Sequence, residues 1–158
     1  MQGGGDVTVE LSQWVNQVLG FSSEYAGSSK SIIGEPRVYP NKGRIIEFVW
    51  ETLNCSGNNQ WIEVKFDKPV QPRSVHIYET YNAGCVTEVQ LRAGAGGWAT
   101  AWRRQGETEQ IEKSRIFSPD LSPFEGSTDS VRVELDVSRT ASGCAYCDID
   151  AIKLVGLL

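Results

Sequence analysis

Histidine is almost absent from this sequence of 158 residues, in which His76 is the only one. General acid–base catalysis uses histidine more often than any other side chain, and nucleophilic catalysis needs a serine or cysteine beside a base. The sequence has no recognisable nucleophile turn, and the pattern around His76 places this residue in the middle of a strand. The sequence therefore predicts that the protein is not an enzyme.

Positive charge is also scarce, and long apolar runs are missing. The chain has 15 Lys and Arg against 20 Asp and Glu, and only Arg103 and Arg104 are adjacent cations. Because nucleic acids are bound mainly through clustered cations, nucleic acid is not an expected partner. The longest apolar stretch, near residues 152–158, is far shorter than the roughly 20 residues that span a bilayer, so no transmembrane segment is predicted.

The length of the chain predicts a single domain. A core of this size buries roughly 70% of the surface of the unfolded chain, so folding does not require disulfides. The first residues, Met-Gln-Gly-Gly-Gly, lack the basic start and apolar stretch of a secretory signal. We therefore expect a flexible leader over residues 1–10 and one domain over residues 11–158.

Short strand-like runs recur along the chain and are bounded by turn-forming residues. Alternation of apolar and polar side chains is plainest over 62–66 and 131–137, which predicts one buried and one solvated face. The predicted strands are residues 15–22, 44–50, 60–66, 74–80, 86–93, 99–104, 115–118, 130–137 and 148–155. Helical periodicity is weak, over 11–19 and in one turn at 29–33. This pattern predicts an all-β fold, an antiparallel β-sandwich.

Two of these strands are joined by the polar connection Tyr81-Asn82-Ala83-Gly84. On the first strand, alternation places Val75 and Ile77 inward and His76 and Tyr78 outward. Loops at the end of a rigid sandwich present side chains without disturbing its core. We therefore expect function at this connection.

Three segments, "SVHIYETYNAG", "QWIEV" and "DIDAIKLVG", carry a resemblance that extends over residues 14–156. They resemble the discoidin-like, galactose-binding-type β-sandwich of a group of F-box proteins with leucine-rich repeats. More distantly, the chain is similar to coagulation-factor C domains and family 32 carbohydrate-binding modules. The resemblance implies a non-catalytic jelly roll of about eight antiparallel strands, with ligands held by loops at one end.

The resemblance also implies a structural calcium ion. Asp148 matches the acidic residue that begins the last strand in this family, and Glu35 and Asn41 lie in the loop that faces it. These oxygens suit Ca²⁺, which prefers about six to eight oxygen ligands. However, this chain has Lys42-Gly43-Arg44 where its relatives have an acidic turn, so Arg44 could instead neutralise Asp148 directly.

Four cysteines, Cys55, Cys85, Cys144 and Cys147, have no counterpart in the family pattern. Their even number suits two disulfides in a secreted module, each worth about 2–4 kcal/mol. Cys144 and Cys147 have the spacing of zinc ligands, but Cys55 and Cys85 do not, which disfavours zinc. Free thiols are the third alternative.

A carbohydrate is the expected ligand. Sugar rings present apolar C–H faces surrounded by hydroxyl groups, so sugar sites combine a flat aromatic side chain with amides or carboxylates. Aromatic residues and asparagines in or beside the predicted loops supply this chemistry. The candidate ligand-binding residues are Trp50, Asn58, Tyr81, Asn82 and Tyr146.

The sequence therefore predicts a non-catalytic recognition module that binds a carbohydrate or glycoprotein through loops at one end of the sandwich. The alternative is a protein–protein interaction domain of a larger protein. Its contact surface would be the same loops or the face that carries His76 and Tyr78, and it would be wide and flat.

Overall fold

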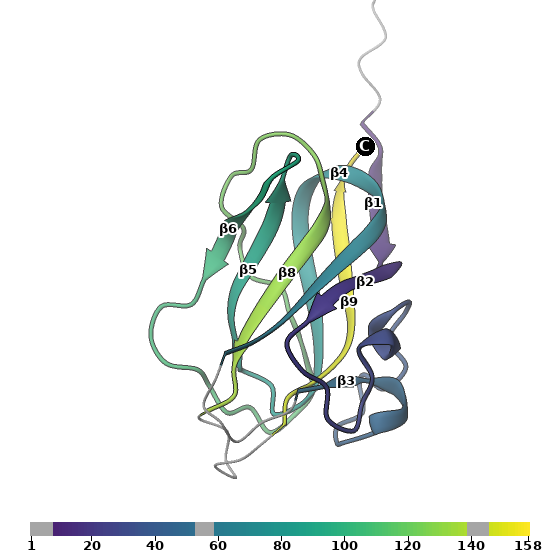
Figure 1. Cartoon of the computed structure of the whole chain (residues 1–158), viewed down its shortest axis with the longest axis vertical. Coiled ribbons are helices and arrows are strands. Elements are labelled where there is room, and N and C mark those ends of the chain that lie inside the picture. The colour runs from purple at the N-terminus through teal and green to yellow at the C-terminus, as the bar shows by residue number, and fades with distance from the viewer. Residues whose placement is uncertain (1–7, 53–58, 139–145) are drawn as a thin grey trace, which may run out of the picture.

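The computed structural model of the protein describes residues 8–52, 59–138 and 146–158. Within these residues, the chain consists mainly of antiparallel strands (Figure 1). The strands are β1 (Glu10–Trp14), β2 (Gln17–Phe21), β3 (Trp50–Glu51), β4 (Asn59–Tyr81), β5 (Val86–Ala93), β6 (Gly97–Arg103), β7 (Arg115–Phe117), β8 (Thr128–Asp136) and β9 (Asp148–Leu157). Two short 3-10 helices, η1 (Ser29–Ile32) and η2 (Ile46–Phe48), precede β3. The predicted all-β antiparallel fold is confirmed.

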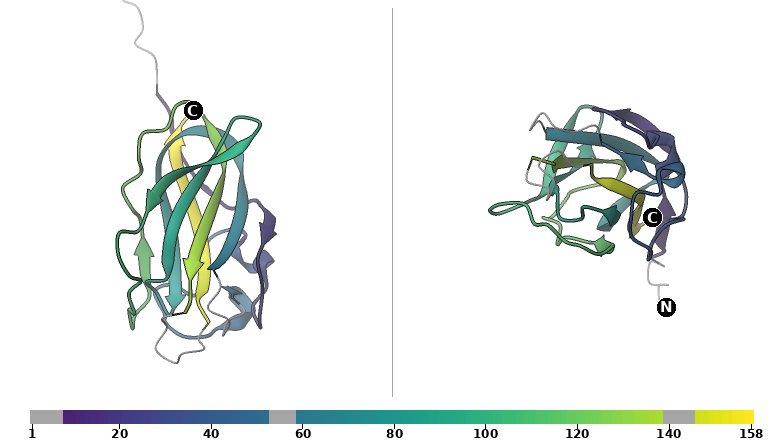
Figure 2. Two further views of the ribbon diagram at one scale, coloured as in Figure 1. Left: turned by 60° about the vertical axis from the view of Figure 1, so that its left-hand side comes forward. Right: turned by 90° about the horizontal axis from the view of Figure 1, so that it is seen from below.

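The long strand β4 belongs to both layers of the sandwich. Its first half pairs with β2 and β8, and β5 and β6 continue that layer. Its second half pairs with β9 and β7, while β1 and β3 pair with β9 in the other layer. The strand curves over one end of the sandwich between these halves, and the two layers face each other in the views of Figure 2. The sequence had predicted two separate strands, 60–66 and 74–80, in place of this one.

The core lies between the two layers and is built from the inward side of each alternating strand. Val75 and Ile77 are fully buried, as predicted. Tyr78, which was expected to face outward, is only 7% exposed. Its ring is covered edge-on by Trp14 of β1 and by Tyr39, with ring centroids 5.5 Å and 5.3 Å away. The predicted outward position of Tyr78 is therefore wrong, because the loop before η2 and strand β1 cover this part of the sheet.

The N-terminal third differs most from the sequence prediction. The helix suggested by the weak periodicity over 11–19 is wrong, because these residues form strands: β1 pairs with β9 and β2 pairs with β4. The expected strand over 44–50 is wrong, because its middle forms η2 and only its last residue enters β3. The turn at 29–33 is confirmed as η1, which Ser28 caps by accepting a hydrogen bond from the Lys30 backbone N–H. In the part of the chain that the structure describes, no helix has the length and apolar character needed to cross a bilayer.

Gly156 of β9 lies close to β4 at the point where β4 passes between the layers. A Cβ at this position would lie 2.5 Å from both the Gln71 carbonyl oxygen and a Val70 methyl group. We expect Gly156→Ala to lower the free energy of unfolding by about 1–3 kcal/mol in urea denaturation, because backbone atoms must move to admit the methyl group. Gly97→Ala is the matched control, since nothing lies within 4 Å of its Cβ position. Equal stability of the two variants would contradict the packing described here.

Candidate functional site

The connection between β4 and β5 meets the start of β9 at one end of the sandwich. Asn82 has a positive φ of 51° and Gly84 one of 108°, a backbone shape that favours Asn and Gly. A Cβ on Gly84 would overlap the Glu109 carbonyl, so this turn is closely packed. The Asn82 side-chain amide donates a hydrogen bond of 2.7 Å to the Tyr146 carbonyl. The structure thus brings together the predicted residues Tyr81, Asn82 and Tyr146.

An aromatic pair lies at this end. The Tyr146 ring is stacked on Tyr25, with centroids 4.5 Å apart and planes inclined by 10°. The Arg44 guanidinium carbon lies 4.3 Å from the centroid of Tyr146 and 5.9 Å from that of Tyr25. Tyr25 is 53% exposed, so much of its surface remains open to solvent. We call Tyr25, Tyr146 and Arg44 the tyrosine platform.

Two members of the tyrosine platform were missed by the sequence analysis. Tyr25 follows β2 and is held by a backbone hydrogen bond from its N–H to the Glu51 carbonyl, 2.9 Å long. Arg44 was noted only as a counter-ion for Asp148. No local sequence pattern predicts that Tyr25 or Arg44 contacts Tyr146, because segments distant in the sequence must first pair.

Trp50 does not take part in this surface. Its side chain is fully buried, and its indole N–H donates a 2.8 Å hydrogen bond to the Ser23 carbonyl. The pairing of β3 with β9 turns the ring into the core, where no ligand reaches it. Its predicted role in ligand binding is therefore wrong, and it instead supports the segment that leads to Tyr25. Asn58, the remaining candidate, lies outside the described residues.

A buried pair of carboxyl groups lies beside the platform. Arg44 donates two hydrogen bonds, of 2.7 Å and 2.8 Å, to the fully buried Glu51. Although burial favours the protonated form, these bonds hold the pKa of Glu51 below its ordinary value. Burial, and then the neighbouring Glu51, raise the pKa of Asp148 to about 9. Arg44 therefore forms its ion pair with Glu51, not with Asp148, and Asp148 keeps its proton at neutral pH.

The 35–41 loop, which carries the predicted calcium ligands Glu35 and Asn41, is held by a carboxyl group other than that of the third predicted ligand, Asp148. Asp150 holds this loop. Its carboxylate accepts hydrogen bonds from the backbone N–H groups of residues 37, 38 and 39, at 2.9, 2.9 and 2.7 Å. Among residues 8–52, 59–138 and 146–158, no three His, Cys, Asp or Glu side chains gather as metal ligands would. Calcium stays a prediction, and these side chains give it no geometric support.

Two of the four cysteines meet below the platform. The Sγ atoms of Cys85 and Cys147 are 2.6 Å apart, both side chains are buried, and both are free thiols in this structure. Each thiol also donates to the Asn82 carbonyl, at 3.2 Å from Cys85 and 3.5 Å from Cys147. Cys55 and Cys144 lie outside the described residues, so the structure does not address their predicted pairing or a zinc site.

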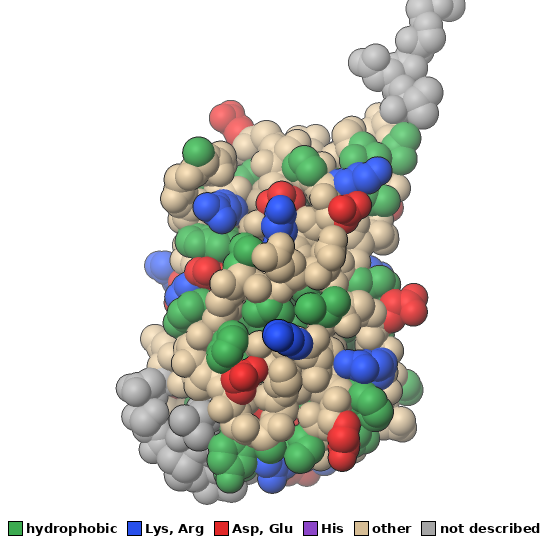
Figure 3. Space-filling model, turned by 45° about the vertical axis from the view of Figure 1, so that its right-hand side comes forward, with side chains coloured by type: hydrophobic (Ala, Val, Ile, Leu, Met, Phe, Trp, Pro, Cys, Tyr) green, Lys and Arg blue, Asp and Glu red, His purple; other side chains and the backbone are tan. Residues whose placement is uncertain are grey.

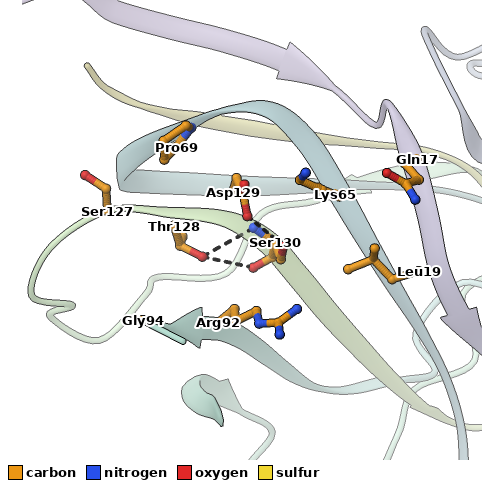
Figure 4. A pocket seen from close by; sticks show the side chains of 10 residues that line it. All are labelled: Gln17, Leu19, Lys65, Pro69, Arg92, Gly94, Ser127, Thr128, Asp129 and Ser130. Atoms are coloured by element: carbon orange, nitrogen blue, oxygen red, sulfur yellow. Dashed lines mark hydrogen bonds between the residues drawn. The ribbon is translucent and has the colours of Figure 1, made fainter. Parts of the chain in front are cut away.

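A separate concavity of about 440 Å³ lies at the opposite end of the sheet (Figure 4). Within the described part of the chain, neither Lys65 nor Arg92, which both line it, has an ion-pair partner. Ser130 in its wall donates a 2.8 Å hydrogen bond to Asp129. The lining residues are Gln17, Leu19, Lys65, Pro69, Arg92, Gly94, Ser127, Thr128, Asp129 and Ser130. None of the predicted site residues is among them.

The two-layer antiparallel architecture is that of the galactose-binding-like β-sandwich. The family 32 carbohydrate-binding module of C. perfringens NanJ, solved in complex with galactose, superposes with a TM-score of 0.60 at 15% identity, over 92% of this chain and 99% of that one. Reduced XRCC1 bound to the catalytic domain of DNA polymerase beta superposes with a TM-score of 0.59 at 12% identity, over 89% and 95%. Allantoicase from Saccharomyces cerevisiae, an enzyme, superposes with a TM-score of 0.58 at 11% identity, over 88% and 39%. These superpositions show the fold, and at such low identities they show the fold alone. They confirm the resemblance seen in the sequence.

One curated protein with a similar sequence is F-box/LRR-repeat protein 4 from Bos taurus. It is 22% identical over 186 aligned residues, which include 96% of this chain and 29% of that protein. The chain thus spans less than a third of this relative. No protein-family model matches the sequence.

The raised pKa of Asp148 predicts how stability depends on pH. The folded state binds this proton more tightly than the unfolded state, whose ordinary pKa is 3.8, so stability falls as the pH rises from about 4 to about 9. Asp148→Asn removes this titration. We expect its melting temperature to exceed that of the wild type by an amount that grows from about pH 5 to about pH 9 and reaches at least about 2–4 °C, equivalent to about 1 kcal/mol.

The matched control is Asp129→Asn, because Asp129 lies at the far end of the sheet, away from Glu51 and Asp148. A melting-temperature difference between Asp148→Asn and wild type that stays constant with pH would contradict a retained proton.

Adding calcium to the wild type and to Asp148→Asn tests the metal prediction in the same experiment. A calcium-dependent rise in the wild type that Asp148→Asn abolishes would support the calcium site instead.

Proposed function

We propose that the protein is a non-catalytic recognition module that binds a carbohydrate or glycan on the tyrosine platform. The observation that carries this proposal is the exposed Tyr25 ring, which is stacked on Tyr146 beside the Arg44 guanidinium. A flat ring next to charged and amide groups offers a sugar both an apolar face and hydrogen-bond partners. The galactose complex of the similar carbohydrate-binding module supports the choice of ligand class.

Each group of the platform has a distinct role in this proposal. The free surface of Tyr25 packs against the C–H face of a sugar ring. Arg44 uses its Nε and Nη2 atoms to bind Glu51, and its side chain is still 36% exposed, which leaves Nη1 to donate to sugar hydroxyls. Asn82 uses its amide N–H on Tyr146, so its side-chain oxygen is the group that can accept from a hydroxyl. Tyr81, which is half-buried beside Asn82, borders the site.

The rigid support of the platform favours specific recognition. Arg44 is held by two hydrogen bonds to a buried carboxylate, and Tyr25 and Tyr146 hold each other by stacking. Side chains that are already ordered lose little conformational entropy when a ligand binds. The site is therefore suited to a weak but defined sugar contact.

A protein partner is the second candidate, because XRCC1, which has a similar fold, was solved bound to a polymerase domain. The surface that the sequence suggested for this role is partly closed, since Tyr78 is buried. On the face seen in Figure 3, exposed apolar side chains stand in small groups between polar and charged ones. Of the two surfaces that the sequence suggested for a protein partner, the loops at the sandwich end are therefore the better candidate.

Tyr25→Ala is the direct test of the platform. We expect this change to weaken sugar binding by about tenfold, because a lost stacking contact is worth about 1.5 kcal/mol. The measurement is isothermal titration calorimetry with the best sugar identified on a glycan array. Since Tyr25 is largely exposed, its removal should change the free energy of unfolding by only about 0.5 kcal/mol.

Lys65→Ala combined with Arg92→Ala is the matched control, because it alters the concavity at the far end of the sheet. Loss of sugar binding in this control, but not in Tyr25→Ala, would move the site to that concavity. If no sugar on the array binds, the carbohydrate proposal fails and the protein-partner candidate takes its place.

A further inference from the structure

Two buried thiols connect the segments that carry the proposed site. Cys85 directly follows the β4–β5 connection, and Cys147 directly precedes β9, 62 residues further along the chain. The accessible fractions of the two residues are 2% and 3%. Their Sγ atoms are 2.6 Å apart, closer than thiols that merely pack, and a bonded pair would be about 2.05 Å apart.

The surroundings of the thiols bring the two segments together independently of the sulfur contact. The Asn82 carbonyl accepts from both thiols, and the Asn82 amide donates to the Tyr146 carbonyl. The Cys147 backbone N–H donates a 3.1 Å hydrogen bond to the hydroxyl of Thr52, the residue after β3, so this part of the chain also holds the segment. Backbone bonds on several sides therefore keep Cys85 and Cys147 facing each other.

We propose that Cys85 and Cys147 form a disulfide that fastens the β4–β5 connection to the start of β9 beneath the tyrosine platform. The contact between the two sulfur atoms, both of them buried, is the observation that carries this pairing.

The bond forms by thiol–disulfide exchange with an oxidised disulfide such as glutathione disulfide or an oxidised disulfide oxidoreductase. The thiolate of one cysteine attacks a sulfur of that disulfide, which releases one thiol and leaves a mixed disulfide. The thiolate of the other cysteine then attacks the protein sulfur and releases the second thiol. The protein loses two hydrogen atoms and is oxidised, while the external disulfide gains them and is reduced.

Burial governs the rate of this exchange. Burial, and then contact with Cys85, raise the pKa of the Cys147 thiol well above its ordinary value, so little of it is thiolate in the folded protein. The disulfide therefore forms mainly while the chain folds or when this end opens locally. Once formed, it is shielded from reducing thiols for the same reason.

The effect on the site rests on the proposed function. Cys147 adjoins Tyr146 in the sequence, and Cys85 hydrogen-bonds to Asn82. The cross-link fixes the spacing between Tyr146 and Asn82, which both belong to the site. The oxidised protein then binds sugar more tightly, because the distance between the segments of Tyr146 and Asn82 varies less before the ligand binds.

The test compares the protein refolded with oxidised and reduced glutathione against the same protein kept reduced. Free thiols are alkylated under denaturing conditions, and the peptides are sequenced by tandem mass spectrometry after cleavage beside Tyr146, which separates Cys144 from Cys147. We expect one linked peptide that joins Cys85 to Cys147 and has lost two hydrogen atoms. Full alkylation of both residues, or linkage of either to Cys55 or Cys144, would overturn the pairing.

The variant that carries both Cys55→Ser and Cys144→Ser is the matched control, because it retains only the proposed pair. We expect this variant to melt about 5–15 °C higher when oxidised than when reduced. Cys85→Ser should abolish that difference. If Cys85→Ser does not fold, the peptide map of the wild type still decides the pairing.

Sugar titration of the oxidised and reduced forms separates the two proposals. We expect about two- to tenfold tighter binding by the oxidised form. A cross-link without binding of any sugar would overturn the proposed function and leave the disulfide standing. Equal affinity in both forms would overturn the coupling between the disulfide and the platform.

Discussion

Strand pairing along both halves of β4 is the constraint on which the rest of the structure depends. This strand of 23 residues supplies backbone partners to β2 and β8 in one layer and to β9 and β7 in the other. Buried backbone groups must be paired, so each layer takes its position from β4. The end of β4 leads directly into the turn at Asn82, which is why this turn has a fixed position relative to the start of β9.

The buried carboxyl groups connect the stability of the fold with the shape of the site. Glu51 is buried in β3, and a buried carboxylate requires a paired and hydrogen-bonded cation. Arg44 meets this requirement and is thereby held beside Tyr146. Asp148 needs no cation, because its raised pKa keeps it protonated and a second buried charge is avoided. The platform is therefore held in place by buried groups.

The candidate site could be predicted from the sequence only in part. Tyr81 and Asn82 could be found because a polar, glycine-bearing turn between two alternating strands marks the end of a sandwich. Tyr25 could not, since it follows β2 and reaches Tyr146, 121 positions later in the numbering, only after the layers pack. Trp50 was misjudged for a related reason, because the strand it enters is only two residues long and shows no alternation that would reveal its inward face.

The sequence by itself determined the all-β class and the inward faces of the strongly alternating strands, because alternation follows directly from strand geometry. Tertiary structure decided which residues meet at the sandwich end. Asp150, and not Asp148, contacts the 35–41 loop, since β9 presents Asp150 to the backbone N–H groups of this loop and turns Asp148 toward Glu51. Cys85 likewise contacts Cys147 because the starts of β5 and β9 lie close together. Such contacts join residues far apart in the chain, and short-range patterns do not encode them.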